Sequence, residues 1–217
     1  MKTRVIVIRH SERDKKHNDP QTLTILGEAV AFLMGIVLRK FNLNINAHVS
    51  SPQNRAHRTL LLLIRGLQGI SDASHFAIQT DPRLDDFSND KSEVVKTAMP
   101  IVKKWAKDHD ITAEQGMFQT AEGRAALAAK LPGFMQCIDE LGSKMGDQLV
   151  ATHGAIIDAA GAELKRRLGE DLPFGMGALG GQLWYCEGWM ATYEDGILKA
   201  VEVIRLPDGF KAAAARI

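Results

Sequence analysis

The chain has 217 residues, of which 45% are hydrophobic and 24% are charged. This composition is typical of a folded globular protein and excludes a disordered chain. The 27 lysines and arginines nearly balance the 26 aspartates and glutamates, so the formal net charge is +1. A charge so close to zero argues against binding to nucleic acid or to an anionic membrane through bulk charge. The length predicts one domain spanning residues 1–217.

The cysteines and the apolar runs indicate the cellular compartment of the protein and whether it enters a membrane. Cys137 and Cys186 lie far apart and form no C-x-x-C motif, which favours a reducing compartment and predicts no zinc site. The first apolar run, Val5–Ile8, is too short for a signal peptide, and no stretch approaches the ~20 apolar residues of a membrane span. We therefore expect a cytoplasmic protein that does not enter a membrane, and the oligomeric state stays open.

The first elements alternate between strand and helix. Val5–Ile8 is β-branched and continuously apolar, which predicts a strand buried on both faces of a parallel sheet. Thr24 is a candidate N-cap for a helix that runs to about Lys40. Residues 47–50 predict a second strand. Ser51 and Pro52 are expected to open the next helix, with serine as its cap and proline in its first turn.

The rest of the chain continues this alternation around a helical insertion. Residues 76–79 predict a third strand, and residues 88–130 predict an insertion that precedes a helix returning to the sheet. Residues 148–152 and 155–168 predict a fourth strand and its helix. Residues 183–193 and 197–206 predict a β-hairpin. The order predicts an α/β fold, a three-layer α/β/α domain with a mostly parallel central sheet, a helical insertion and a C-terminal β-hairpin.

Three of the predicted strands are followed by arginine or histidine. Arg9 and His10 follow the first strand, Arg55 lies one turn into the helix after the second, and His153 follows the fourth. In open α/β sheets, ligands bind beyond the carboxyl ends of the strands. Two arginines and two histidines at one edge would form a compact cationic pocket, and guanidinium groups match phosphate oxygens. The pattern therefore predicts a site for a phosphoryl group.

Four motifs, taken in order, resemble the histidine phosphatase superfamily, also called phosphoglycerate-mutase-like. They are Arg9-His10, Leu23-Thr24-x-x-Gly27, Ser51-Pro52-x-x-Arg55-Ala56 and Thr152-His153-Gly154. The resemblance spans about residues 4–165, and the chain departs from the family pattern at Ser11, where the family usually has glycine. It implies a single histidine-phosphatase-like domain whose insertion, residues 88–130, lies over the active site.

The resemblance also implies an activity, that of a phosphoric-monoester hydrolase without metal or cofactor. His10 would form a phosphohistidine, while Arg9, Arg55 and His153 would hold the phosphate oxygens. The preferred substrate class is a small phosphorylated molecule, with a phosphoprotein as the alternative.

The remaining roles are assigned by position within the family pattern. Leu84-Asp85-Asp86 stands where the family has an acidic residue that protonates the leaving group, so Asp86 is the first choice and Asp85 the second. Arg13 resembles a later arginine that contacts phosphate in a subgroup of phosphatases. Arg13, Asp85 and Gly154 are the expected substrate contacts.

Two other functions are weighed against the phosphatase. Phosphoryl transfer of the phosphoglycerate mutase type is disfavoured because such mutases carry Glu-Arg-His-Tyr-Gly after the third strand, which residues 86–88 do not reproduce. A catalytically weak, phospholigand-binding regulatory module is suggested by Ser11 and by aspartate in place of glutamate. Residues 175–180 match the dinucleotide pattern G-x-G-x-x-G but precede no helix, so no nucleotide cofactor is expected.

Overall fold

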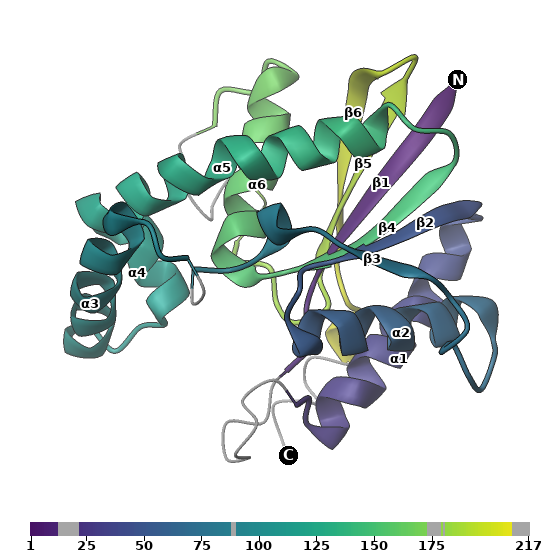
Figure 1. Ribbon diagram of the computed structural model, residues 1–217, viewed down its shortest axis with the longest axis horizontal. Helices are drawn as coiled ribbons and strands as arrows, with labels where there is room; N and C mark the ends of the chain where they lie inside the picture. Colours follow the sequence, from purple (N-terminus) through teal and green to yellow (C-terminus); the bar gives the residue numbers. More distant parts are fainter. Residues whose placement is uncertain (13–21, 88–89, 173–178, 180, 210–217) are drawn as a thin grey trace.

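The computed structural model describes residues 1–12, 22–87, 90–172, 179 and 181–209. A six-stranded sheet in the order β3-β2-β4-β1-β5-β6 forms its centre (Figure 1). The strands are β1 (Lys2–Arg9), β2 (Ile45–Ser50), β3 (Ile78–Thr80), β4 (Asp147–Thr152), β5 (Gly188–Glu194) and β6 (Ile197–Ile204). Strands β3, β2, β4 and β1 are parallel, whereas β5 and β6 are antiparallel. The predicted α/β fold with a mostly parallel sheet is confirmed.

Helices cover both faces of this sheet. In the described residues they are α1 (Ile25–Leu38), α2 (Asn54–Gln68), α3 (Glu93–Asp108), α4 (Ala113–Gln119), α5 (Ala121–Gly142) and α6 (Gly154–Arg167). Two short 3₁₀ turns, η1 (Arg39–Phe41) and η2 (Pro82–Leu84), follow α1 and β3. Helices α1 and α2 lie on one face, and α5 and α6 lie on the other (Figure 1). The result is the three-layer arrangement that the sequence predicts.

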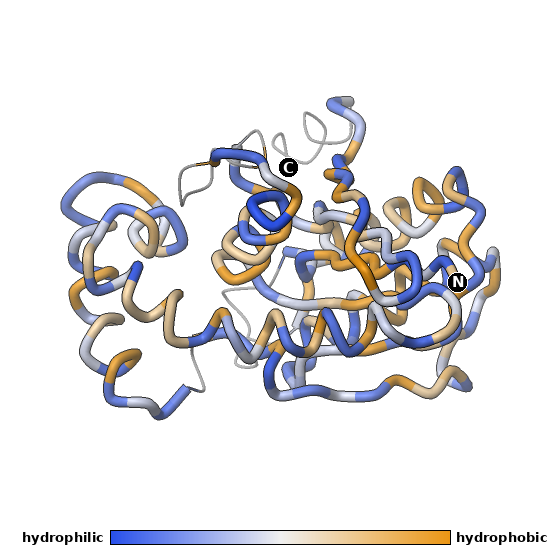
Figure 2. The backbone as a smooth tube through the Cα atoms, turned by 90° about the horizontal axis from the view of Figure 1, so that it is seen from above, coloured by the Kyte–Doolittle hydropathy of each residue, from blue (hydrophilic) through white to orange (hydrophobic). Residues whose placement is uncertain are grey.

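The central strand β1 explains why two cores form. Val5 and Val7 pack into the core under α5 and α6, whereas Ile6 and Ile8 pack into the core under α1 and α2. Successive strand side chains point to opposite faces, so a continuously apolar strand must be covered on both sides. The strands at the centre of Figure 2 accordingly contain long hydrophobic stretches, while the helices mix hydrophobic and hydrophilic residues.

The two helices beside the site begin in different ways. The hydroxyl of Thr24 accepts a bond from the Gly27 backbone N–H, so the predicted cap of α1 is confirmed. The predicted start of α2 is wrong, because the helix begins at Asn54 and Gln53 occupies the cap position without a side-chain cap bond. The hydroxyl of Ser51 is engaged elsewhere, with His153 and Asp85. The same hydroxyl accepts a bond from the Gln53 backbone N–H at 3.3 Å, so Ser51 contacts both the residue that precedes α2 and the site.

The helical insertion is continuous with the layer on the sheet. Between residues 90 and 130 it contains α3, α4 and the first part of α5. Helix α5 then continues past Pro132 to Gly142 and packs on the face that α6 also covers (Figure 1). A proline inside a helix removes one backbone hydrogen bond, a loss that the buried residues around Phe134 and Ile138 offset by packing. One helix thus joins the insertion to the sheet.

Two predicted strands have shifted limits. The third strand begins at Ile78, and the hairpin begins at Gly188, because residues 183–187 form a loop in which Cys186 has φ of 59°. Most of the G-x-G-x-x-G pattern at residues 175–180 lies outside the described residues. Cys137 and Cys186 are buried free thiols. Among the described helices, none has the length and apolar character needed to cross a membrane.

Candidate functional site

The four motif residues meet at the carboxyl edge of the sheet. Arg9 ends β1 and His10 follows it, His153 follows β4, and Arg55 is the second residue of α2. The ring centroids of His10 and His153 lie 5.1 Å apart. The Arg55 guanidinium lies between them, with Nε 3.3 Å from His10 Nε2 and a terminal nitrogen 3.3 Å from His153 Nδ1. All four side chains are buried, so the predicted grouping of these residues is present.

The hydrogen bonds of His10 leave one ring nitrogen available for chemistry. His10 Nδ1 lies 2.6 Å from the Ser11 carbonyl oxygen, which can only accept, so Nδ1 carries the proton. Nε2 then holds the lone pair, which accepts a bond from Arg55 Nε at 3.3 Å. Burial is the largest cause that holds the pKa of His10 well below its usual 6.5, followed by repulsion from His153 in its charged form and from Arg55 and Arg9. The ring is therefore neutral near pH 7, with its unprotonated nitrogen pointing toward Arg55.

His153 is oriented by a short relay to Asp85. A guanidinium only donates, so His153 Nδ1 accepts from Arg55 and His153 Nε2 carries the proton. Nε2–H donates to the Ser51 hydroxyl at 2.7 Å, and that hydroxyl donates to Asp85 Oδ1 at 3.3 Å. Asp85 also accepts bonds from the Gln53 side-chain amide and from the Asp86 backbone N–H. Asp85 thus fixes the orientation of the His153 ring through the Ser51 hydroxyl, on the side of the ring that faces away from Arg55.

Asp86 reaches the cluster more directly than Asp85. Its Oδ2 accepts a bond from the Arg55 guanidinium, and its Oδ1 lies 2.6 Å from the Gln53 amide nitrogen. One fifth of the Asp86 side chain is exposed, against 11% for Asp85. Asp86 Oδ2 is 3.8 Å from His153 Nδ1. Of the two candidate acids, Asp86 is the one whose carboxylate accepts a bond from Arg55.

A third carboxylate, which the sequence motifs do not indicate, comes from the insertion. Glu114 lies in the first turn of α4, and its two oxygens are 2.9 and 2.8 Å from a terminal nitrogen of Arg9. Arg9 also donates to the Leu183 carbonyl, and its carbon lies 4.6 Å from the ring centroid of Tyr185. The capping box at Thr112 predicts that α4 starts here, but nothing local to Glu114 indicates a contact with Arg9.

Gly154, expected to contact substrate, begins α6 directly behind this ion pair. A Cβ at this position would lie 2.5 Å from Glu114 Oε1, so glycine admits the carboxylate. The side-chain amide of Gln182 donates to the other Glu114 oxygen at 2.8 Å. Asp158, one turn further along α6, is buried beneath Arg9 and Glu114, and burial raises its pKa to about 7.

Ser11 has a defined role at the point where the chain departs from the family pattern. It is fully buried, its backbone N–H donates to the Thr59 hydroxyl, and its own hydroxyl donates to the Gly27 carbonyl at 2.6 Å. A Cβ at Gly27 would collide with the Glu12 backbone oxygen, which explains the glycine in that motif. Serine therefore ties the loop after His10 to the start of α1.

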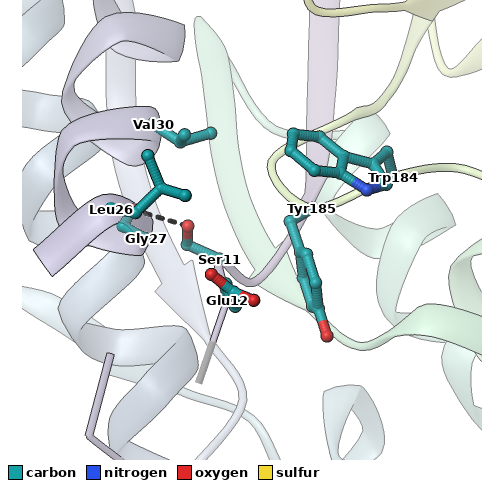
Figure 3. Close-up of a pocket in the computed structure, with 7 residues that line it drawn as sticks. All are labelled: Ser11, Glu12, Leu26, Gly27, Val30, Trp184 and Tyr185. Carbon is teal, nitrogen blue, oxygen red and sulfur yellow. Dashed lines mark hydrogen bonds between the residues drawn. The ribbon is translucent and has the colours of Figure 1, made fainter. Parts of the chain in front are cut away.

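A small pocket lies next to this loop. It measures about 170 Å³, including space open to solvent, and is lined by Ser11, Glu12, Leu26, Gly27, Val30, Trp184 and Tyr185. The aromatic rings of residues 184 and 185 stand opposite the apolar side chains of α1 (Figure 3). The Tyr185 ring is 6.0 Å from the His10 ring, so the pocket borders the candidate nucleophile.

Two further predictions concern a substrate contact, Arg13, and the absence of a metal site. Arg13 lies outside the described residues. Among those that are described, no three His, Cys, Asp or Glu side chains are grouped so as to hold a metal ion.

Comparison with known proteins identifies the family. The model of the histidine phosphatase superfamily (branch 1) matches residues 5–174, so the chain belongs to this superfamily. Among curated proteins, no sequence match was found.

Solved structures share the fold at low identity. Phosphoglycerate mutase from Bacillus anthracis is 18% identical, with 99% of this chain and 97% of that chain covered and a TM-score of 0.57. Mycobacterial glucosyl-3-phosphoglycerate phosphatase, solved with VO3, is 17% identical, with 94% and 99% covered and a TM-score of 0.59. Members with this fold thus include both phosphatases and mutases.

Proposed function

We propose that this protein is a phosphoric-monoester hydrolase that forms a covalent phosphohistidine on His10. The observation that carries the proposal is the state of the His10 ring. Its Nδ1 is bound to the Ser11 carbonyl, and its neutral Nε2 faces a cluster containing Arg9, Arg55 and His153. A neutral imidazole beside two guanidinium groups is suited to attack a phosphorus atom whose oxygens those groups hold.

The first step would transfer the phosphoryl group to the enzyme. His10 Nε2 forms a bond to phosphorus while the ester P–O bond breaks, and Arg9, Arg55 and the protonated form of His153, which the dianion favours, stabilise the equatorial oxygens. The leaving oxygen takes a proton from Asp86. Binding of a dianion beside Asp86 favours the protonated form of that carboxyl, because like charges oppose each other.

The second step would return His10 to its starting state. Water attacks phosphorus, Asp86 accepts a proton from that water, and the P–N bond breaks to release inorganic phosphate. Across both steps one ester and one water are consumed, and one alcohol and one phosphate are formed. The positive charge in this scheme comes from the two arginines, so the proposal needs no metal or cofactor. The proposed substrate is a small phosphorylated molecule.

Trapping and a panel of phosphate monoesters test the proposal together. Acid-labile, alkali-stable phosphate should appear on the parent protein during turnover, and His10→Ala should abolish both this phosphate and hydrolysis. His75→Ala, which changes an exposed histidine, is the matched control and should keep the parent rate. Hydrolysis by His10→Ala at the parent rate would falsify the assignment of the nucleophile.

The same panel separates the alternatives. Interconversion of 2- and 3-phosphoglycerate faster than hydrolysis of any ester would replace the phosphatase with a mutase. Binding of vanadate without hydrolysis of any monoester would instead support a phospholigand-binding module.

A further inference from the structure

Glu114 is the one acidic side chain that the helical insertion places directly on a motif arginine among the described residues. It comes from α4, more than a hundred residues away from Arg9 in the sequence, and its carboxylate contacts the guanidinium at 2.8 Å. About a third of the Glu114 side chain is exposed, whereas Arg9 is almost fully buried. The carboxylate therefore lies between the buried arginine and solvent.

The position of this carboxylate is fixed by three separate elements. Gln182 donates to Oε2 from the loop before β5, and Arg9 donates from the end of β1. Gly154 at the start of α6 leaves the space that Oε1 fills. An exposed glutamate on a surface helix would have no such set of contacts, so the fold builds a place for this negative charge beside the phosphoryl site.

We propose that Glu114 is a specificity-determining residue, whose carboxylate disfavours phosphate esters with a second negative charge on the leaving group. The inference rests on the proposed function, because the leaving group approaches Glu114 only when the phosphoryl group is held by Arg9 and His10. The favoured substrates are phosphate esters of neutral alcohols or of amino alcohols.

The charges around the site support this selectivity. Arg9 and Arg55 are each already paired with a carboxylate, Glu114 and Asp86, and Asp85 adds a third behind them. Two guanidinium groups thus face three carboxylates before a dianionic phosphoryl group enters. A leaving group with its own carboxylate would add repulsion at short range, whereas an ammonium group would be attracted. A neutral alcohol would experience neither effect.

Three esters of similar size measure this effect. They are 2-aminoethyl phosphate, 2-hydroxyethyl phosphate and carboxymethyl phosphate, which differ mainly in the charge of the leaving group. For the parent we expect kcat/KM to fall in that order, with the hydroxyethyl ester preferred over the carboxymethyl ester by about tenfold. Glu114→Gln should bring this ratio close to one. Glu93→Gln, at an exposed site on α3, is the matched control and should keep the parent ratio.

The ratio separates selectivity from a purely structural role. If Glu114 only holds Arg9 in place, Glu114→Gln will lower kcat/KM for all three esters equally and leave the ratio unchanged, which overturns the inference. Gly154→Ala gives a second route, because its Cβ would displace the carboxylate without removing the charge. We expect a ratio between those of the parent and Glu114→Gln.

The outcomes also distinguish this inference from the proposed function. A parent protein that hydrolyses the neutral and anionic esters equally well remains a phosphatase but lacks the proposed selectivity. A parent protein that hydrolyses neither these three esters nor any other monoester of the panel, and that carries no trapped phosphate, overturns both.

Discussion

The two arginines of the site are held by carboxylates of different origin. Arg55 is paired with Asp86, which follows β3 and belongs to a network with Gln53 and Asp85 at the edge of the sheet. Arg9 is paired with Glu114, which the insertion brings in from α4. The Asp86 side chain is 20% exposed and the Glu114 side chain 32% exposed, so the sheet side of the site is the more enclosed.

This difference suggests a division of roles between the two regions. Groups fixed by strand ends and by buried hydrogen bonds can hold reacting atoms in place, because the surrounding core leaves them no alternative position. A group carried by an insertion can differ between members of a fold without disturbing that geometry. We therefore expect the Arg55 side to control the rate and the Glu114 side to control the choice of substrate.

The largest expected effect comes from the Arg55 side. Arg55→Lys replaces a planar group that bridges His10 and His153 with a single ammonium, so the cluster loses its central donor. We expect kcat/KM to fall about 10²–10³-fold for every ester, irrespective of leaving-group charge. Arg58→Lys, an exposed position on the same helix, is the control. An Arg55→Lys variant within threefold of the parent would contradict this division of roles.

The second effect distinguishes the two neighbouring aspartates. Asp86→Asn removes the proposed proton donor, so hydrolysis of alkyl phosphates should slow about 10²-fold. Hydrolysis of p-nitrophenyl phosphate should slow much less, because p-nitrophenolate leaves without a proton. Asp85→Asn should lower both rates by a similar, smaller factor, since Asp85 acts through Ser51 on His153. The reverse pattern would make Asp85 the acid.

The third expected effect is on stability rather than on activity, and it lies on the Arg9 side. Burial raises the pKa of Asp158 to about 7, from 3.8, so folding favours its protonated form. The resulting cost is absent below about pH 3.8, grows as the pH rises and is complete above about pH 7. Asp158→Asn keeps an acceptor for the Leu183 N–H and removes the charge.

Urea unfolding at two pH values tests this effect. We expect Asp158→Asn to raise the free energy of unfolding by on the order of 2–4 kcal/mol at pH 8, with almost no difference at pH 4. A difference that is the same at both pH values would mean that packing, not ionisation, separates the two proteins.

Much of the sheet side of the site could be predicted from short stretches of sequence. Arg9, His10 and His153 each directly follow or end an apolar strand, and parallel strands place their carboxyl ends at one edge. Arg55 is found by the same reasoning, because it lies at the start of the helix that follows β2. These positions depend on local pattern and on a general rule of sheet topology.

The hydrogen-bond partners of individual side chains could not be predicted from local sequence in this way. Ser51 has the residue type and position of a helix cap, yet its hydroxyl links His153 to Asp85 and α2 begins at Asn54. The hydroxyl accepts from the Gln53 backbone N–H as a local pattern allows, and it also contacts two polar side chains from distant segments. Those two contacts depend on the tertiary structure.

The sequence by itself determined the α/β architecture, the order of the main elements and the four motif residues, because periodicity and strand-end position are encoded in neighbouring residues. The tertiary structure alone decided that Glu114 lies on Arg9, that Asp86 rather than Asp85 contacts Arg55, and that Gly154 makes room for a carboxylate. These contacts join segments far apart in the chain. Their formation depends on how α4 and α5 pack against the sheet, which no local pattern records.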